Sequence, residues 1–388
     1  MGGAMLKRVW IQGYRCFQDV TIELKPLQIL VGPNGSGKSA FLDAVRFVED
    51  IVRNGLRRAI ARRVWNPEEL VWEGKADGVE IELTWEWKEG EEGPLHEVTY
   101  AIALERQQKD LRIAKEYLKD SGTEIYIRRG REVQLFGKQI PLWADEDDMT
   151  VLAGIFLFPG LMRSELMRSF PMRLQNLQKW MVNAWPEFLH PHPFAIRLGG
   201  RKWEEPRHHR IYPNARNLAL VMDRFQRDHP EAYRRWLEEM RILANAPLEF
   251  KVHVDEVTGI HRIAMRWDGL WVSPSGITDG WLRFMALSLP AYDPENEGRI
   301  FFIEEIENGL SPDAIEMLFR IMEETPEMQW LVTSHHPLLV RLAGPERLLI
   351  FSRDKEGVRV VSGDRHPLLA NLDPRSDLAD LLLARIFL

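Results

Sequence analysis

The stretch Gly32-Pro33-Asn34-Gly35-Ser36-Gly37-Lys38-Ser39 decides the fold. It follows the apolar run at residues 27–31 and precedes residues 38–53, whose apolar positions recur at helical spacing. In this strand–turn–helix pattern, G-x-x-x-x-G-K-[ST], backbone N–H groups and the helix N-terminus surround phosphate oxygens. We expect Lys38 to reach the β- and γ-phosphates and the Ser39 hydroxyl to bind Mg²⁺. The predicted nucleotide-binding residues are Asn34, Gly35, Ser36, Gly37, Lys38 and Ser39.

Two carboxylates end the segment Arg299-Ile300-Phe301-Phe302-Ile303-Glu304-Glu305. An apolar strand delivers them to its carboxyl end, where ligands of open α/β sheets bind. We predict that Glu304 holds the Mg²⁺ shell and that Glu305 is the general base for the attacking water. A solvated acidic strand end is the simpler interpretation. The turn that follows, residues 306–312, favours the functional one because such a turn packs close to a partner.

A histidine motif, Thr333-Ser334-His335-His336-Pro337, follows another predicted strand. A histidine at such a strand end can donate a hydrogen bond to the γ-phosphate and sense its loss. We favour His335 over His336, because Pro337 fixes the chain direction just beyond. Taken alone, the motif is typical of a surface turn, and its place after a second βα unit favours the functional interpretation.

The fourth motif, residues 275–283, leads into an apolar helix and contains Thr278, Asp279 and Gly280. Thr and Asp are natural helix N-caps, and glycine permits close approach of a ligand to the backbone. By itself this is a helix start. Because the motif lies shortly before the carboxylate pair in sequence, we also interpret it as part of a nucleotide site.

The order of elements along the chain predicts one composite α/β domain. Alternating residues indicate strands at 6–11, 20–24, 79–87, 98–104 and 125–140, and a hairpin at 250–267. Residues 161–244 show helical periods, and residues 300–351 alternate strand and helix, which predicts a parallel sheet. We expect an N-terminal half at 1–160, an inserted helical lobe at 161–247 and a C-terminal half at 248–388.

Composition excludes several classes of protein. With 45% hydrophobic and 28% charged residues the chain is globular, and its formal charge of −7 excludes a polycation. Cys16 is the single cysteine, so an internal disulfide is impossible and a reducing cytoplasm is expected. The longest apolar stretch, residues 151–162, is interrupted by glycine and proline, so no membrane span is predicted.

Together these motifs resemble an ABC-class ATPase head, specifically the branch that includes RecF, the OLD-family ATPases and the SMC heads. Residues 7–17 resemble the first strand of that branch and its Arg-aromatic turn. Residues 32–39 resemble Walker A, Glu304 and Glu305 resemble Walker B with the catalytic glutamate, and residues 277–283 resemble the signature. The resemblance implies a P-loop parallel sheet with an N-terminal antiparallel β subdomain and an inserted helical lobe.

The resemblance also implies an ATPase that uses ATP and Mg²⁺ in a sandwich homodimer, with higher oligomers left open. Walker A of one copy holds ATP, and Thr278, Asp279 and Gly280 of the other cap its γ-phosphate. Three departures stand out: Thr278 where Ser is usual, Glu304 for the commoner Asp, and Ser311 where His is frequent. The Q-loop glutamine stays open among Gln107, Gln108 and Gln134.

Two functions compete. The first is an ATPase that regulates a separate effector, such as a nuclease, in genome maintenance or anti-phage defence. The tail carries Asp364, Asp373, Asp377 and Asp380 without a convincing two-metal pattern, so a nuclease is expected on another chain. The second is an ATP-gated scaffold that binds DNA or protein with little turnover. A membrane-transporter ATPase fits less well, because Leu-Ser-Gly-Gly-Gln is absent, and a P-loop kinase leaves the signature without a role.

Basic clusters bear on DNA binding. One follows the Walker A helix, and the second lies in a proline-punctuated loop. Either could contact phosphates, although charge runs are more often solvated surface. The clusters are Arg57, Arg58, Arg62 and Arg63, and Arg197, Arg201, Lys202, Arg207 and Arg210 with His208 and His209.

Overall fold

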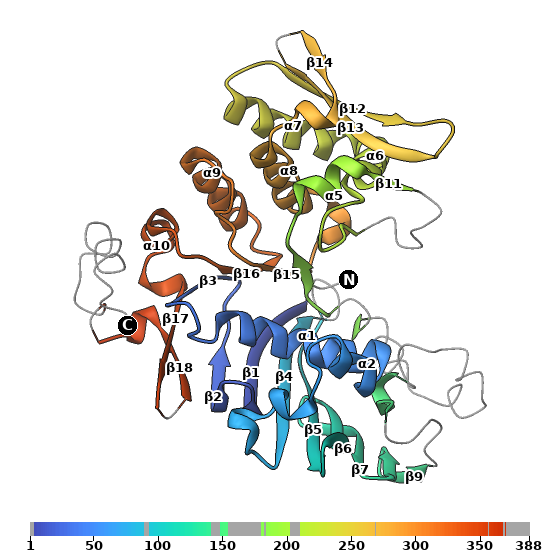
Figure 1. Cartoon of the computed structure of the whole chain (residues 1–388), viewed down its shortest axis with the longest axis vertical. Helices are drawn as coiled ribbons and strands as arrows, with labels where there is room; N and C mark the ends of the chain where they lie inside the picture. The colour runs from blue at the N-terminus through green and yellow to red at the C-terminus, as the bar shows by residue number, and fades with distance from the viewer. Residues whose placement is uncertain are drawn as a thin grey trace.

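The computed structural model describes residues 4–88, 93–140, 148–153, 180–181, 184–201, 210–267, 269–355, 357–367 and 369. These residues form two sheets in the body and a smaller sheet in a lobe above it (Figure 1). The chain is therefore α/β, as the sequence predicts.

The central sheet of the body has the order β10-β15-β16-β3-β17-β18. Its strands are β3 (Leu27–Val31), β10 (Glu187–Leu189), β15 (Ile300–Ile303), β16 (Gln329–Thr333), β17 (Leu348–Asp354) and β18 (Gly357–Ser362). All neighbouring pairs are parallel except β17 and β18. The strands β3, β15 and β16 are buried throughout, which explains their unbroken apolar sequences.

The two faces of this sheet belong to different cores. Leu30, Phe302 and Leu331 pack against α1 (Lys38–Asn54) and the antiparallel sheet. Their chain neighbours, such as Ile29 and Val332, pack against the helices on the other face. The period of two along each strand therefore holds the sheet between two apolar layers.

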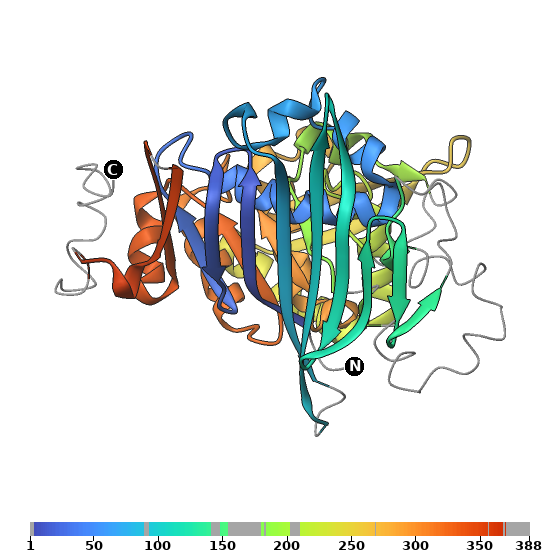
Figure 2. The ribbon, with the colours of Figure 1, turned by 90° about the horizontal axis from the view of Figure 1, so that it is seen from below.

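The antiparallel sheet covers the lower side of the body and is seen broadside in Figure 2. It has the order β2-β1-β4-β5-β6-β7-β8-β9. Its strands are β1 (Ala4–Tyr14), β2 (Phe17–Glu23), β4 (Gly78–Lys88), β5 (Leu95–Gln107), β6 (Asp110–Asp120), β7 (Thr123–Arg129), β8 (Glu132–Leu135) and β9 (Lys138–Ile140). Between β2 and β4 the chain forms β3, α1, α2 (Leu56–Ala61) and the short 3-10 helices η1 (Pro67–Leu70) and η2 (Trp72–Gly74).

The upper layer is helical and carries the third sheet. Its helices are α5 (Pro193–Leu198), α6 (Leu218–Asp228), α7 (Pro230–Ala244), α8 (Asp279–Tyr292), α9 (Pro312–Glu323) and α10 (Pro337–Ala343). The sheet consists of β11 (Gly200–Arg201), β12 (Leu248–Val254), β13 (Ile260–Trp267) and β14 (Leu270–Val272). The hairpin expected around residues 258–259 is β12 and β13.

The structure differs from the sequence interpretation in its details. The strand β6 was not predicted, and β10, inside the segment expected to be helical, joins the central sheet beside β15. Residues 154–179 lie outside the described residues, so the division at 160 and 247 stays a prediction. Among the helices that the structure describes, none is long and apolar enough to cross a membrane.

Candidate functional site

Three parallel strands bring the predicted motifs to one edge of the central sheet. β3, β15 and β16 are adjacent, and the motifs follow their carboxyl ends. A cleft of about 860 Å³ opens there. Its lining includes Asn34, Gly35, Gly37, Lys38, Ser39, Glu304, Glu305 and His335. All of the sequence-predicted phosphate, metal and base residues of these three motifs except Ser36 therefore line one cavity.

The Lys38 side chain folds back onto the backbone of its own glycine-rich loop. Lys38 Nζ donates hydrogen bonds to the carbonyl oxygens of Gly32 (2.7 Å) and Pro33 (3.0 Å). Burial lowers the pKa of Lys38 to about 8, although Glu305 and Glu307 act in the opposite direction. A buried ammonium held only by carbonyl oxygens is well placed to exchange them for phosphate oxygens.

Gly37 has a backbone conformation that only glycine adopts readily. Its φ is +109°, and a β-carbon there would lie 2.9 Å from Val358 Cγ2. Ser36, by contrast, is buried and is not among the residues that line the cleft. Within the described part of the chain, its Oγ has no hydrogen-bond partner. The motif therefore contributes to the cleft mainly its backbone and the side chains of Lys38 and Ser39.

The two carboxylates after β15 differ in their surroundings. Glu305 is exposed and has a φ of +48°. Its backbone N–H donates to Thr333 Oγ1 at 2.9 Å, and Asn308 Nδ2 donates to its Oε2 at 2.6 Å. Glu304 lines the same cleft and is half-buried. The positive φ, held by Thr333 of the neighbouring strand, therefore aims the Glu305 carboxylate at the open side of the cleft.

Glu307 is a residue that the sequence interpretation left without a role. Its Oε1 accepts a 2.7 Å hydrogen bond from the His335 backbone N–H, and its Oε2 is buried without a partner among the described atoms. Burial, followed by the charge of Lys38, lowers the pKa of His335. The imidazole is therefore neutral at pH 7, with one N–H to donate and one nitrogen to accept.

The signature residues lie elsewhere. Thr278, Asp279 and Gly280 line a second cavity, of about 540 Å³, and not the first cleft. Thr278 occupies the N-cap position of α8, but its side chain makes no capping hydrogen bond, and both it and Asp279 are exposed. A β-carbon on Gly280 would lie 2.7 Å from the Gly309 carbonyl oxygen, so glycine is also required for packing within the chain.

Arg197 of α5 holds the segment just before α8 that leads into Thr278 and Asp279, which we call the signature turn. Its guanidinium donates to the carbonyl oxygens of Pro274 (3.2 Å) and Ile277 (2.7 Å) and pairs with Asp279 at 2.5 Å. Further along α8, Arg283 Nη1 donates to the Pro191 carbonyl oxygen at 3.2 Å. The turn is therefore fixed in place before any ligand arrives.

His190 lines the cleft and was also missed from sequence. It follows β10, whose parallel pairing with β15 places its end beside the carboxylates. The proposed Q-loop candidates are elsewhere: Gln107 and Gln134 are in β5 and β8, Gln108 is in the turn between β5 and β6, and none lines the cleft. Recognition of the short strand Glu187–Leu189 would have pointed to His190.

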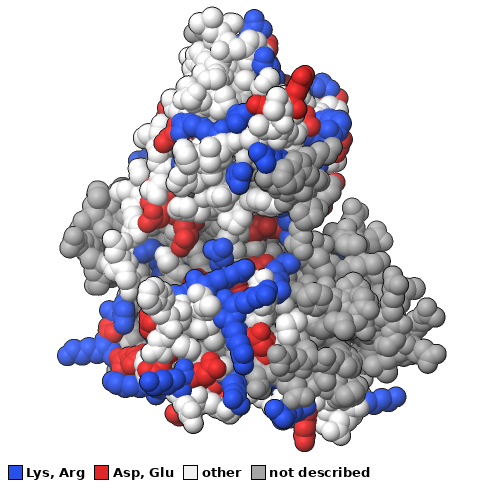
Figure 3. Space-filling model, turned by 45° about the vertical axis from the view of Figure 1, so that its right-hand side comes forward, with Lys and Arg blue, Asp and Glu red and all other residues white. Residues whose placement is uncertain are grey.

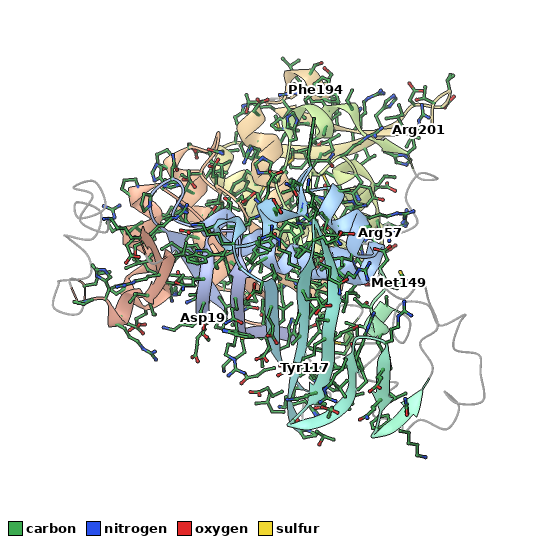
Figure 4. The ribbon with its side chains drawn as sticks, turned by 60° about the horizontal axis from the view of Figure 1, so that its bottom comes forward. Asp19, Arg57, Tyr117, Met149, Phe194 and Arg201 are labelled. Carbon is green, nitrogen blue, oxygen red and sulfur yellow. The ribbon has the colours of Figure 1, made fainter. Side chains whose placement is uncertain are left out.

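Several arginines of the two basic clusters form ion pairs within the chain, and their contact with nucleic acid stays a prediction. Arg63 pairs with Asp43 and Asp50, and Arg62 also pairs with Asp50. Arg197 holds the signature turn, and Arg210 pairs with Glu187. Figure 4 places Arg57 at α2 of the body and Arg201 in the lobe, so the clusters lie apart. Lys202, Arg207, His208 and His209 lie outside the described residues, as do Asp373, Asp377 and Asp380.

Comparison with known families agrees with this geometry. A family model described as the RecF/RecN/SMC N terminal domain matches residues 5–358. The chain belongs to this family. It is an ABC-class head of the RecF/OLD/SMC branch, as the motifs indicate.

Solved structures of SMC heads share the fold of this RecF/RecN/SMC domain. A crystal structure of an SMC head bound to the C-winged helix domain of ScpA has 15% identity and a TM-score of 0.58, and the match covers 92% of this chain and 97% of that chain. An SMC head with an extended coiled coil from Pyrococcus furiosus, bound to the C-terminal domain of ScpA, has 13% identity and a TM-score of 0.51, with 92% and 96% covered. At these identities the likeness concerns the fold alone.

One curated relative matches a shorter stretch of this chain. The OLD nuclease of Thermus scotoductus is 43% identical over 53 residues, which span 14% of this chain and 10% of the relative. The match therefore covers about a tenth of that protein.

Proposed function

We propose that this chain binds and hydrolyses ATP in the cytoplasm and that ATP joins two copies of it. One observation carries the proposal. The cleft holds the Walker A and Walker B residues and His335, while the signature turn opens into a separate cavity of the same chain. A signature that is to touch the nucleotide must then come from a second copy.

Each side chain in the cleft has a distinct task in this proposal. Lys38 leaves the carbonyl oxygens of its loop and binds the β- and γ-phosphates. Glu305 orients and deprotonates the attacking water, and Asn308 fixes the rotation of its carboxylate. His335, neutral in the free protein, donates a hydrogen bond to the γ-phosphate.

The residues present fit Mg²⁺. Ser39 and Glu304 both line the cleft and offer the hard oxygen ligands that this ion prefers. Among the described residues no group of three or more His, Cys, Asp and Glu could hold a metal by itself. This suits Mg²⁺, which usually keeps several waters and shares the substrate's phosphates. Bound there, the ion would neutralise phosphate charge.

The second copy completes the site from outside. Thr278 and Asp279 are exposed at the N-terminus of α8. Such a terminus favours an anion. Each copy therefore supplies the cleft for one ATP and the signature for the other, so ATP stabilises the dimer and hydrolysis releases it.

The test is the Glu305→Gln variant, examined by multi-angle light scattering with and without ATP and Mg²⁺. We expect ATP to convert this variant to a dimer, with turnover reduced by about 10²–10⁴-fold, because the general base is lost while the binding groups remain. The matched control is Glu316→Gln on the exposed surface of α9. A variant that stays monomeric at saturating ATP would refute dimerisation through the nucleotide.

We propose that the ATPase regulates a separate effector chain. Its relative carries the name OLD nuclease, and the similar SMC heads were solved with a bound domain of ScpA. An effector of the nuclease kind, in genome maintenance or anti-phage defence, is the first candidate. An ATP-gated scaffold on DNA or protein with little turnover is the second. Steady-state ATPase measured with and without DNA tests the DNA-linked form of both candidates: a rate that DNA leaves unchanged weakens that form and favours a protein partner.

A further inference from the structure

Trp65 is the most exposed large apolar side chain that the structure describes, with a relative accessibility of 102%. It follows α2 and lies between the buried Val64 and Asn66, which lines the nucleotide cleft. Trp65 itself is not part of the cleft lining. Trp65 is therefore a fully exposed indole next in sequence to a residue of the cleft lining.

The second cavity has the opposite character. Its volume of about 540 Å³ is bounded by Trp267, Trp281, Phe284 and Leu243. The rings of Trp267 and Trp281 meet edge to face at 5.7 Å, so the wall is aromatic and well packed. The lining also includes residues 278–280 of the signature, together with Leu310, Ser311 and Asp313 just before and in the first turn of α9. A cavity with an aromatic wall and a polar rim thus lies directly beside the signature.

We propose that Trp65 of one copy inserts into this cavity of the other copy when the two close on ATP. The inference rests on the dimer proposed above. In that dimer the signature turn of one copy meets the cleft of its partner. The rim of the second cavity then faces the rim of the cleft, where Trp65 stands. Closure of the dimer therefore brings the exposed indole of one copy to the aromatic cavity of the other. The cavity volume of about 540 Å³ is large enough for an indole ring.

Charged side chains lie near both parts of the proposed contact. Arg57, Arg58 and Arg62 are exposed on and just after α2, near Trp65 in sequence. Asp279 and Asp313 are exposed at the rim of the second cavity. Figure 3 shows that Lys and Arg side chains gather on the body below the lobe. Arg62 is already paired with Asp50 and Asp279 with Arg197, and Glu68 and Glu69 also follow Trp65 closely in sequence. Arg57 and Arg58 of one copy and Asp313 of the other are therefore the charges that would attract each other across the contact.

Cross-linking tests the placement directly. In a Cys16→Ser, Glu305→Gln background, chains carrying Trp65→Cys are mixed with chains carrying Ala244→Cys, a residue of the cavity wall. A short bis-maleimide should join unlike chains when ATP and Mg²⁺ are present and leave them unjoined without nucleotide. The control pair replaces Ala244→Cys by Leu95→Cys, which is exposed on β5 of the antiparallel sheet. A dimer that forms by light scattering without this cross-link overturns the inference and leaves the proposed dimer standing.

Affinity provides the second readout. In the Glu305→Gln background, Trp65→Ala should weaken ATP-dependent dimerisation by about 30-fold or more, as loss of a buried aromatic anchor does. Trp65→Phe should recover much of the loss. ATP affinity of the monomer, measured with a fluorescent analogue at low protein concentration, should be the same in all three chains. Unchanged dimer affinity in Trp65→Ala contradicts the inference. A loss of monomer ATP affinity contradicts it too, because Trp65 would then contact the nucleotide of its own chain.

Discussion

The Glu307 carboxylate accepts a 2.7 Å hydrogen bond from the His335 backbone N–H. The contact joins the turn after β15 to the segment after β16, so it ties the histidine to the strand that carries the carboxylates. Movement of either segment when the γ-phosphate leaves would reach the other through this bond.

Replacement of Glu307 by Ala should therefore lower ATP turnover by about tenfold or more, because His335 loses the acceptor that positions its backbone. Glu307→Gln keeps a side-chain oxygen at the same place and should retain most activity. Single-turnover hydrolysis separates this effect from ATP binding, which neither change should alter greatly. Equal loss in both variants would indicate that the charge of Glu307, and not its hydrogen bond, is what matters.

The lowered pKa of Lys38 predicts proton uptake on ATP binding. Below about pH 8 the lysine is charged in the free protein, and binding needs no proton. Bound phosphates raise the pKa of the ammonium, so above pH 8 binding takes up a proton and affinity falls by about tenfold per pH unit until the pKa of the complex is reached. Calorimetric titration in two buffers of different ionisation enthalpy measures this uptake.

The control for that measurement is Lys38→Arg, whose guanidinium stays charged throughout the range. It should bind ATP without proton uptake between pH 8 and 10, whatever its affinity. Uptake of the same size in this variant would assign the proton to another group.

The sequence predicted the parts of the fold that depend on unbroken patterns. β3, β15 and β16 are continuous apolar runs because both faces are buried, and each carries its motif at the carboxyl end. It did not reveal β10, because three residues give no period, and the strand exists only through its pairing with β15. His190 was missed for the same reason.

The role of Arg197 was hidden by its neighbours. In sequence it belongs to a basic run, which suggests solvent or nucleic acid, whereas its partners Ile277 and Asp279 are brought to it only by the packing of α5 against α8. Contacts between residues so distant in sequence follow from tertiary structure and leave no local pattern.

Arg197→Ala should weaken ATP-dependent dimerisation while leaving ATP binding by the monomer unchanged. The guanidinium holds the backbone of the signature turn at Pro274 and Ile277, so its loss makes the turn mobile, and ordering it costs free energy on dimerisation. Sedimentation in the Glu305→Gln background measures the effect, with Arg234→Ala, an exposed arginine on α7, as the control. Equal dimer affinity in Arg197→Ala would show that the turn is held sufficiently by other contacts.

Substitutions at Thr278 and Gly280 should distinguish an effect on folding stability from an effect on dimerisation. The Thr278 side chain is exposed and caps nothing in the monomer, so Thr278→Ala should change the free energy of unfolding by no more than about 0.5 kcal/mol. Dimerisation on ATP should nevertheless weaken, because the proposed contact with the partner's γ-phosphate is lost. Gly280→Ala places a methyl group 2.7 Å from the Gly309 carbonyl oxygen, so it should lower the melting temperature and impair dimerisation together.

Thermal unfolding and light scattering on the same samples distinguish the two variants. If Thr278→Ala proved as destabilising as Gly280→Ala, the turn would be serving the monomer alone. If Thr278→Ala kept full dimer affinity, the hydroxyl would have no role between copies. Normal stability with weakened association is the outcome expected of a contact across the two chains, since the Thr278 side chain makes no capping hydrogen bond within the described chain.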